Sequence, residues 1–181
     1  MLNEIELEQL RYPIGRYQRL SVIDETQIQE WKNDIAALPM LLKSAVAELT
    51  EANIEIPYRA GGWNVRQITH HLADSHINAY VRFKLALTEE NPTIKPYLQD
   101  RWSDLQDAQH APLAWSLMLL EGVHQRWGMV LDTMRLEDYQ RTFVHPEFKE
   151  ALRLDFTLGL YAWHGKHHLT QIVNFKERYG V

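Results

Sequence analysis

The stretch that decides the fold is residues 61–76, Gly-Gly-Trp-Asn-Val-Arg-Gln-Ile-Thr-His-His-Leu-Ala-Asp-Ser-His. The two glycines mark a turn. Asn64 after them is a good helix N-cap, and Gln67 stands three residues on, as in a capping box. Apolar residues then recur at helical spacing, at Val65, Ile68, Leu72, Ala79 and Phe83. This pattern predicts a helix over residues 64–88 that carries three of the nine histidines of the chain.

Three further segments have the same periodicity and predict helices over residues 24–49, 112–134 and 156–179. Pro39 lies inside the first of them, where we expect a kink or a break, because proline lacks the N–H of a helix hydrogen bond. Gly180 is placed as the C-terminal stop of the last helix. Four helices of this length in one chain predict an all-α four-helix bundle.

The segments between the predicted helices are short or irregular. Residues 141–154 contain two strand-like pieces around a proline, which predicts a small β-hairpin before the last helix. Residues 1–20 look extended, and residues 91–102 look like a connecting loop with two prolines. The chain has no repeat and no linker-like stretch, so we expect a single domain over residues 1–181.

The composition excludes several classes of protein. The chain has 24 acidic and 19 basic residues, which argues against a nucleic-acid-binding protein that relies on a basic surface. The N-terminus does not resemble a secretory signal, and no apolar stretch approaches the roughly 20 residues needed to cross a bilayer. We therefore expect a cytoplasmic protein that binds neither nucleic acid nor membrane. The absence of cysteine excludes thiolate metal clusters and a cysteine nucleophile.

Two histidines of the last predicted helix, His164 and His168, stand four residues apart and share one side of it. At about 100° per residue, His168 falls near the centre of the apolar stripe and His164 near its edge, whereas His167 points away. Two imidazoles turned into a bundle core need polar partners, and a metal ion satisfies both at once. The alternative is that these buried histidines are hydrogen-bonded without a metal.

A third ligand would come from another helix, and the helix after the Gly-Gly turn offers His70, His71 and His76. Face counting places His76 near the centre of the apolar stripe, His71 at its flank and His70 nearly opposite. This counting favours His76 without settling the choice. In each doublet, His70-His71 and His167-His168, we expect one member to point outward.

Several blocks of the chain resemble one known family. Residues 61–89 are similar to the second-helix motif of the DinB superfamily, in its YfiT-like branch of metal-dependent hydrolases, which also includes bacillithiol transferases. The resemblance recurs at residues 12–15, 92–97, 120–127, 145–146 and 158–168, so it covers nearly the whole chain.

This resemblance implies a DinB-like four-helix bundle, a homodimer, and one divalent metal ion per subunit on three histidines. In the family pattern the metal ligands correspond to His71, His164 and His168, so the resemblance favours His71 over His76. The family's run of histidines has Lys166 at one position here. The histidine lost at that position is not a ligand in the family pattern, so the three ligands are retained.

Three neutral imidazoles leave a divalent metal with an open coordination position, which is typical of catalytic sites. Zinc is the first expectation, with nickel, manganese or iron as alternatives. Zinc lowers the pKa of bound water to about 7, which would make the protein a hydrolase of a small-molecule substrate. Activation of a low-molecular-weight thiol would instead make it a bacillithiol-like S-transferase. A third hypothesis is a non-enzymatic, metal-binding stress-response module.

Two further residues are candidates near the metal ligands. Asp74 could accept a hydrogen bond from the second ring N–H of His71; the alternative is a solvated helix carboxylate. His124 is a candidate catalytic residue, as a general base or a water-orienting group. Its alternative role is that of a boundary histidine beside Trp127.

Three polar side chains are candidates for binding an anionic substrate: Arg59, Asn78 and Arg82. A guanidinium group suits a carboxylate or phosphate because its planar fork donates two parallel hydrogen bonds. For Arg82, an ion pair within the bundle is the alternative.

Overall fold

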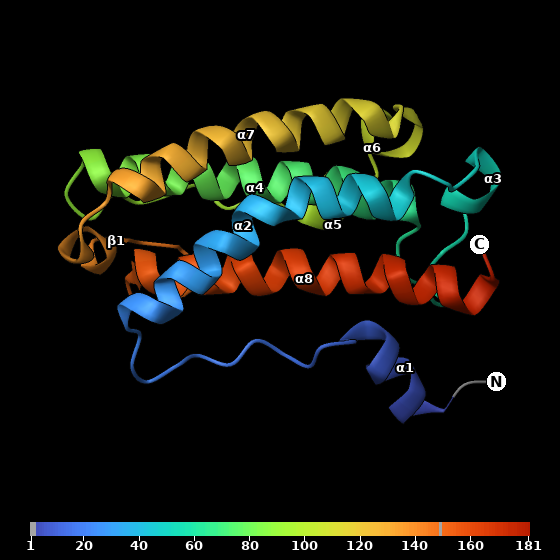
Figure 1. Ribbon diagram of the computed structural model, residues 1–181, viewed down its shortest axis with the longest axis horizontal. Coiled ribbons are helices and arrows are strands. Elements are labelled where there is room, and N and C mark those ends of the chain that lie inside the picture. The colour runs from blue at the N-terminus through green and yellow to red at the C-terminus, as the bar shows by residue number, and fades with distance from the viewer. Residues whose placement is uncertain (1–2, 149) are drawn as a thin grey trace.

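The structure, a computed structural model, describes residues 3–148 and 150–181. Four long helices lie side by side: α2 (Glu25–Val46), α4 (Val65–Thr88), α7 (Leu113–Thr133) and α8 (Leu154–Tyr179) (Figure 1). Their ends differ from the ends expected from the sequence by at most three residues. The prediction of an all-α four-helix bundle is confirmed.

Local signals set the ends of these helices. The Asn64 side chain accepts a hydrogen bond from the Gln67 backbone N–H at 2.8 Å, and the Gln67 side chain accepts one from the Asn64 backbone N–H at 3.2 Å. This capping box satisfies two N–H groups that the first helical turn leaves unpaired. At the other end of the chain, Gly180 adopts a left-handed conformation, with φ of 66°, and ends α8. Pro39 does not break α2, which is helical on both sides of it.

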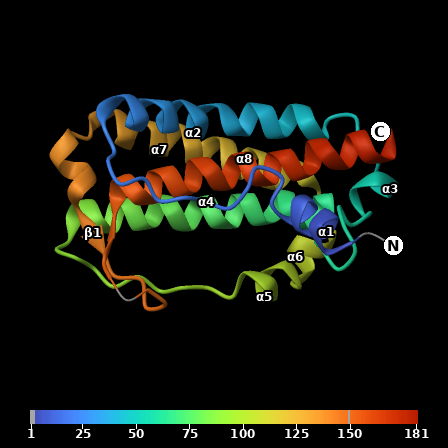
Figure 2. The ribbon, with the colours of Figure 1, turned by 90° about the horizontal axis from the view of Figure 1, so that it is seen from below.

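The helices pack in an order that differs from their order along the chain. α2 packs against α7 and α8, and α4 packs against the same two helices, so the consecutive helices α2 and α4 lie diagonally across the bundle. α2 and α8 run in one direction, and α4 and α7 in the other (Figure 1). Because the neighbours α4 and α7 are parallel, residues 89–112 must return the chain along the bundle (Figure 2).

That return segment contains the expected connecting loop and two short helices, α5 (Gln99–Ser103) and α6 (Gln106–His110). Another short helix, α3 (Glu51–Ile54), precedes the Gly-Gly turn, and a 3-10 helix, η1 (Leu136–Gln140), follows α7. Strands β1 (Thr142–Phe143) and β2 (Leu152–Arg153) pair antiparallel just before α8. The predicted β-hairpin is therefore confirmed.

The expectation of an extended segment over residues 1–20 is wrong for part of its length. Residues Glu4–Arg11 form helix α1, which begins with a capping box between Asn3 and Glu6. This polar pair was visible in the sequence at the right spacing. The chain after α1 is extended and lies along α8 (Figures 1 and 2), where the Trp163 indole donates a hydrogen bond to the Gly15 carbonyl.

The bundle core has two apolar clusters with a polar layer between them. The cluster on the hairpin side includes Phe83 and Trp127. The cluster at the other end includes Leu72 and Leu120. On α4, α7 and α8, the chain passes from one cluster to the other at a histidine, namely His76, His124 and His164.

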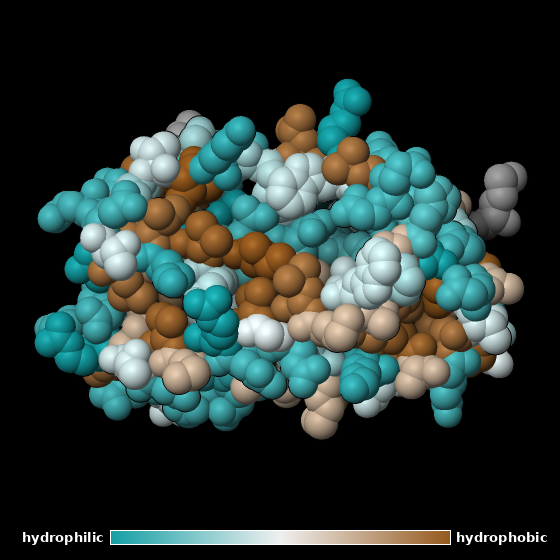
Figure 3. Space-filling model, turned by 90° about the horizontal axis from the view of Figure 1, so that it is seen from above, coloured by the Kyte–Doolittle hydropathy of each residue, from teal (hydrophilic) through white to brown (hydrophobic). Residues whose placement is uncertain are grey.

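Part of the outer surface is apolar. On the face over α7, apolar side chains form a band across the molecule (Figure 3). The large apolar side chains that α7 and α2 expose include Trp115, Met118, Leu119, Met129, Met40 and Leu41. Across the described residues, no helix carries an apolar stretch of the length that a bilayer crossing requires.

Candidate metal centre

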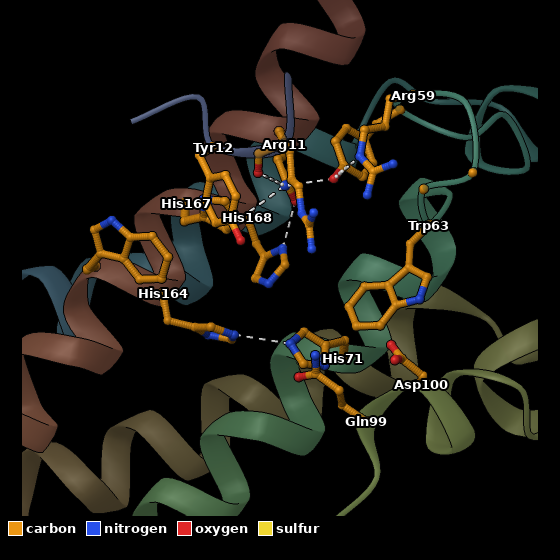
Figure 4. Close-up of a pocket in the computed structure, with 15 residues that line it drawn as sticks. Arg11, Tyr12, Arg59, Trp63, His71, Gln99, Asp100, His164, His167 and His168 are labelled. Atoms are coloured by element: carbon orange, nitrogen blue, oxygen red, sulfur yellow. Dashed lines mark hydrogen bonds between the residues drawn. The ribbon is translucent and has the colours of Figure 1, made fainter. Parts of the chain in front are cut away.

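Three histidines from two helices converge at one point. His164 and His168 lie one turn apart on α8, and His71 faces them from α4 (Figure 4). One ring nitrogen of each lies within 4.8 Å of the corresponding atoms of the other two, and the Nε2 atoms of His71 and His164 are 3.1 Å apart. Within the described part of the chain, no fourth side chain of a metal-ligating type joins this group.

The surroundings keep the three rings neutral. Burial, followed by the neighbouring histidines, lowers the pKa of His71, His164 and His168 well below the usual value of 6.5. A neutral imidazole has one nitrogen lone pair free, which is the form that binds a metal. Three nitrogen donors of this kind suit zinc, nickel or iron. The donor set therefore fits a divalent metal ion.

Hydrogen bonds hold two of these rings from behind. Nδ1 of His168 lies 2.8 Å from Oε1 of Gln171, and Nδ1 of His164 lies 3.3 Å from Nε2 of His76. Both contacts leave the Nε2 atom of the ring free to face the point of convergence. Gln171 is not among the residues expected at the site from the sequence, although it stands three residues after His168 and thus on the same side of a helix.

The three histidines line a pocket of about 430 Å³, which Trp63, Arg59, Tyr12 and Asp100 also line (Figure 4). These other residues come from the turn before α4, from the N-terminal segment and from the return segment. The Trp63 ring lies 4.6 Å from the His71 ring, measured between centroids. The candidate centre is thus buried among the helices on one side and reachable from the surface on the other.

A second pocket, of about 710 Å³, lies next to the first, because Gln99, Asp100 and His164 line both. Its other lining residues include Arg82 and Tyr97. Burial raises the pKa of Tyr97 to about 12. The second pocket therefore offers a cation and an un-ionised hydroxyl beside a candidate metal ligand.

The structure separates the three candidates for binding an anionic substrate. Arg59 lines the first pocket, and its Nε donates a hydrogen bond to the Tyr58 hydroxyl at 2.9 Å. Arg82 lines the second pocket and donates to the Tyr161 hydroxyl at 3.0 Å. Asn78 lines neither of these two pockets, and its amide donates to the Asp74 carbonyl on its own helix. Two of the three candidates thus face the space next to the histidines.

The positions of Asp74 and His124 do not suit the direct roles expected for them, which were a hydrogen bond to His71 and contact with the substrate. No hydrogen bond joins Asp74 to His71 among the residues that the structure describes; burial, and then Asp107, raises the pKa of Asp74 to about 6. His124 is buried outside both pockets, between the Ile35 carbonyl and His76. Burial lowers the pKa of His124 to about 4. The placement of His124 favours an indirect role over contact with a substrate.

The expectation that one member of each histidine doublet points outward is wrong, since His70 and His167 are both buried. The ring of His70 lies between the Ser116 hydroxyl, at 2.7 Å, and the Ala111 carbonyl, at 3.1 Å. The ring of His167 stacks on Trp163. The reason is that the return segment and the N-terminal segment cover the outer faces of α4 and α8. Helical periodicity shows which side of a helix faces the bundle, but it does not show whether another segment of the chain covers the opposite side.

Known proteins resemble this chain in sequence and in fold. The family model described as the DinB superfamily matches residues 34–172. A protein of Bacillus cereus (strain ATCC 10987 / NRS 248), named "Putative metal-dependent hydrolase", is 46% identical over 172 residues, which are 95% of this chain and 98% of the relative. A Bacillus anthracis (strain A0248) protein of the same name has the same identity and coverage.

A solved structure matches over the same length. YfiT from Bacillus subtilis, described as "a probable metal-dependent hydrolase with an unusual four-helix bundle topology", has a TM-score of 0.92 and 45% sequence identity. The match covers 95% of this chain and 98% of that chain. The family match spans most of the bundle, and these relatives match nearly end to end, so this chain belongs to the DinB superfamily.

Proposed function

We propose that this protein is a metal-dependent hydrolase of a small molecule, with one divalent metal ion bound by His71, His164 and His168. The observation that carries the proposal is the convergence of three neutral imidazoles in a pocket that opens to the surface. The names of its relatives support the hydrolase class. Three protein ligands leave a coordination position for substrate or water, whereas structural zinc sites normally have four.

A divalent metal at this point supplies Lewis-acid activation of a nucleophile at neutral pH. The protein contributes the rest. Burial keeps the three imidazoles neutral, and the ring of Trp63 packs against the ring of His71. We propose that Arg59 and Arg82, one in each pocket, bind anionic groups of the substrate. Zinc is the first candidate for the metal, with nickel, manganese and iron as alternatives.

A substrate panel on metal-loaded protein tests the hydrolase class. Esters and amides are offered without thiol, and an electrophile such as monochlorobimane is offered with low-molecular-weight thiols. Hydrolysis without thiol supports the proposal. Conjugation that requires thiol, with no hydrolysis, would replace it by an S-transferase. Stoichiometric metal without turnover of any substrate would favour the metal-binding stress-response module.

Alanine variants test the metal ligands. His71→Ala, His164→Ala and His168→Ala should each lose the metal and the activity, as measured by elemental analysis and turnover of the purified protein. His70→Ala and His167→Ala are the matched controls, because they remove equally buried histidines adjacent in sequence to a ligand. The same metal content in all five folded variants would refute this ligand set.

We also propose that the protein is a homodimer in the cytoplasm. The exposed apolar side chains on α7 and α2 offer a surface that a second copy could cover. Light scattering should report twice the 21.3 kDa mass of the chain, and a monomer at micromolar concentration would contradict the dimer. Cell fractionation tests the location.

A further inference from the structure

A proline inside α2 leaves a backbone acceptor free in the core. Pro39 has no N–H, so the Ile35 carbonyl, four residues earlier, lacks its regular helical partner. Nδ1 of His124, on α7, lies 2.5 Å from this carbonyl oxygen. Because a carbonyl oxygen only accepts hydrogen bonds, Nδ1 of His124 carries the proton.

This proton fixes the direction of the hydrogen bonds that follow. A neutral imidazole has one N–H and one acceptor nitrogen, so Nε2 of His124 accepts. Its partner is Nδ1 of His76, on α4, at 2.9 Å. His76 therefore donates through Nδ1, and its Nε2 accepts in turn.

The last bond reaches a candidate metal ligand. Nε2 of His76 lies 3.3 Å from Nδ1 of His164, on α8, which must donate. The proton of His164 is thus on Nδ1, and its Nε2 has a free lone pair. That Nε2 is the atom that lies 3.1 Å from Nε2 of His71, at the point of convergence.

We infer that the Ile35 carbonyl, His124 and His76 form a histidine relay that holds His164 in the tautomer able to bind a metal through Nε2. The inference rests on the proposed metal site. His76 and His124 are then positioning residues, and neither touches the substrate. The three relay members and His164 come from the four long helices, one from each, so bundle packing itself orients the ligand. Pro39 is thus the residue that leaves the acceptor at the end of the relay free of a helical partner.

If the hydrogen bond between His76 and His164 ran in the opposite direction, His164 would be unable to bind a metal through Nε2. If His76 carried its proton on Nε2, it would donate to Nδ1 of His164, and the proton of His164 would move to Nε2. The hydrogen bond made by one ring nitrogen decides which nitrogen remains for the metal. Only the carbonyl at the far end of the relay breaks this symmetry, since either nitrogen of each ring can donate.

NMR spectra of the metal-free protein with isotope-labelled histidine test the relay directly, because protonated and bare ring nitrogens have distinct chemical shifts. We expect the proton on Nδ1 in His124, His76 and His164. A proton on Nε2 of His164 would overturn the inference. In His124→Leu the fixed end of the relay is gone, and His164 should show a mixture of the two tautomers. A His164 signal unchanged in folded His124→Leu would likewise overturn it.

Zinc affinity, measured by competition with a chelator, is the second readout. His76→Leu should bind Zn²⁺ about 10–100-fold more weakly, as is typical when a partner of a ligating histidine is lost. His124→Leu should weaken binding in the same direction. His70→Leu is the matched control, because it removes a buried, hydrogen-bonded histidine of α4 outside the relay.

Wild-type affinity in folded His76→Leu and His124→Leu would overturn the relay. If these variants fail to fold, the tautomers of the wild-type protein still decide the matter. A wild-type protein that binds no divalent metal would refute the proposed function, whereas the tautomers of the metal-free protein report on the relay alone. Failure of the proposed function is therefore distinguishable from failure of the relay.

Discussion

Oε1 of Gln171 lies 2.8 Å from Nδ1 of His168, on the same side of α8. The amide nitrogen of Gln171 donates to the Arg11 carbonyl at 3.0 Å and to the Tyr58 hydroxyl at 3.1 Å. These contacts turn the amide so that its oxygen faces the imidazole. His168 therefore carries its proton on Nδ1, and its Nε2 is free to bind a metal.

Removal of this contact should weaken metal binding. We expect Gln171→Leu to bind zinc about 10–100-fold more weakly than the wild-type protein, because the ring of His168 loses the acceptor that orients it. Gln171→Glu keeps an acceptor oxygen at the same position and should bind within a few-fold of wild type. Chelator competition measures both affinities. Equal affinity of the Leu and Glu variants would show that Gln171 does not orient the ligand.

The metal-free protein should lose stability as the pH falls below about 6.5. Burial lowers the pKa of His124 and of His167 to about 4. Below pH 6.5 the unfolded chain takes up protons at these histidines, whereas the folded protein does so only near pH 4, so the free energy of unfolding decreases across this window. Asp74, with its pKa raised to about 6, acts in the opposite direction, but it is one group against several histidines.

Urea denaturation with a chelator present, at about pH 7.5 and about pH 5, checks this expectation. We expect the free energy of unfolding to be lower at the acidic pH by at least about 2 kcal/mol, since one unit of pKa shift corresponds to roughly 1.4 kcal/mol. His167→Gln should reduce the difference. A stability that is the same at both pH values would mean that these histidines are not held neutral in the fold.

Two glycines in helices should respond in opposite directions to alanine. A Cβ at Gly159, on α8, would lie 2.6 Å from the Trp31 ring, so Gly159→Ala should destabilise the bundle by about 1–3 kcal/mol through overpacking. A Cβ at Gly128, on α7, would meet nothing within 4 Å. Gly128→Ala should therefore stabilise the protein by about 0.4–1 kcal/mol. Thermal unfolding of the two variants compares them, and the same sign for both would contradict the close approach of α8 to α2.

Replacing either of the two arginines in the pockets should raise the KM of anionic substrates selectively. Arg59→Ala and Arg82→Ala remove a cation next to the candidate metal centre, and a hydrogen bond to a charged group contributes about 1.5–3 kcal/mol. We expect the KM of an anionic ester to rise by about tenfold or more, with little change for a neutral ester. Asn78→Ala is the control, because Asn78 lines neither pocket. An equal rise for both esters would contradict charge recognition.

The helices were predictable because their signals are local. The capping box of Asn64 and Gln67 and the stop at Gly180 act over a few residues, and the structure has both. The signal for helix α1 is equally local, since Asn3 and Glu6 have the spacing of a capping box, but the helix lies in a stretch that was expected to be extended. The packing order was not predictable in this way, since periodicity says which side of a helix is buried but not which neighbour covers it.

For the candidate site, the sequence by itself determined that His164 and His168 share one side of a helix, because that relation depends only on the helical repeat. It also determined that α4 carries three histidines that are candidates for the third metal ligand. Helical spacing did not choose among them, and the resemblance to the DinB superfamily favoured His71. Only the tertiary structure supplies the physical reason: the stagger of α4 against α8 brings His71 to the point of convergence and leaves His76 behind His164. The axial offset between two helices depends on the packing of every residue along their contact, which no short segment encodes. For the same reason the partners of the buried rings, Ile35 and Gln171 among them, became visible only in the folded bundle.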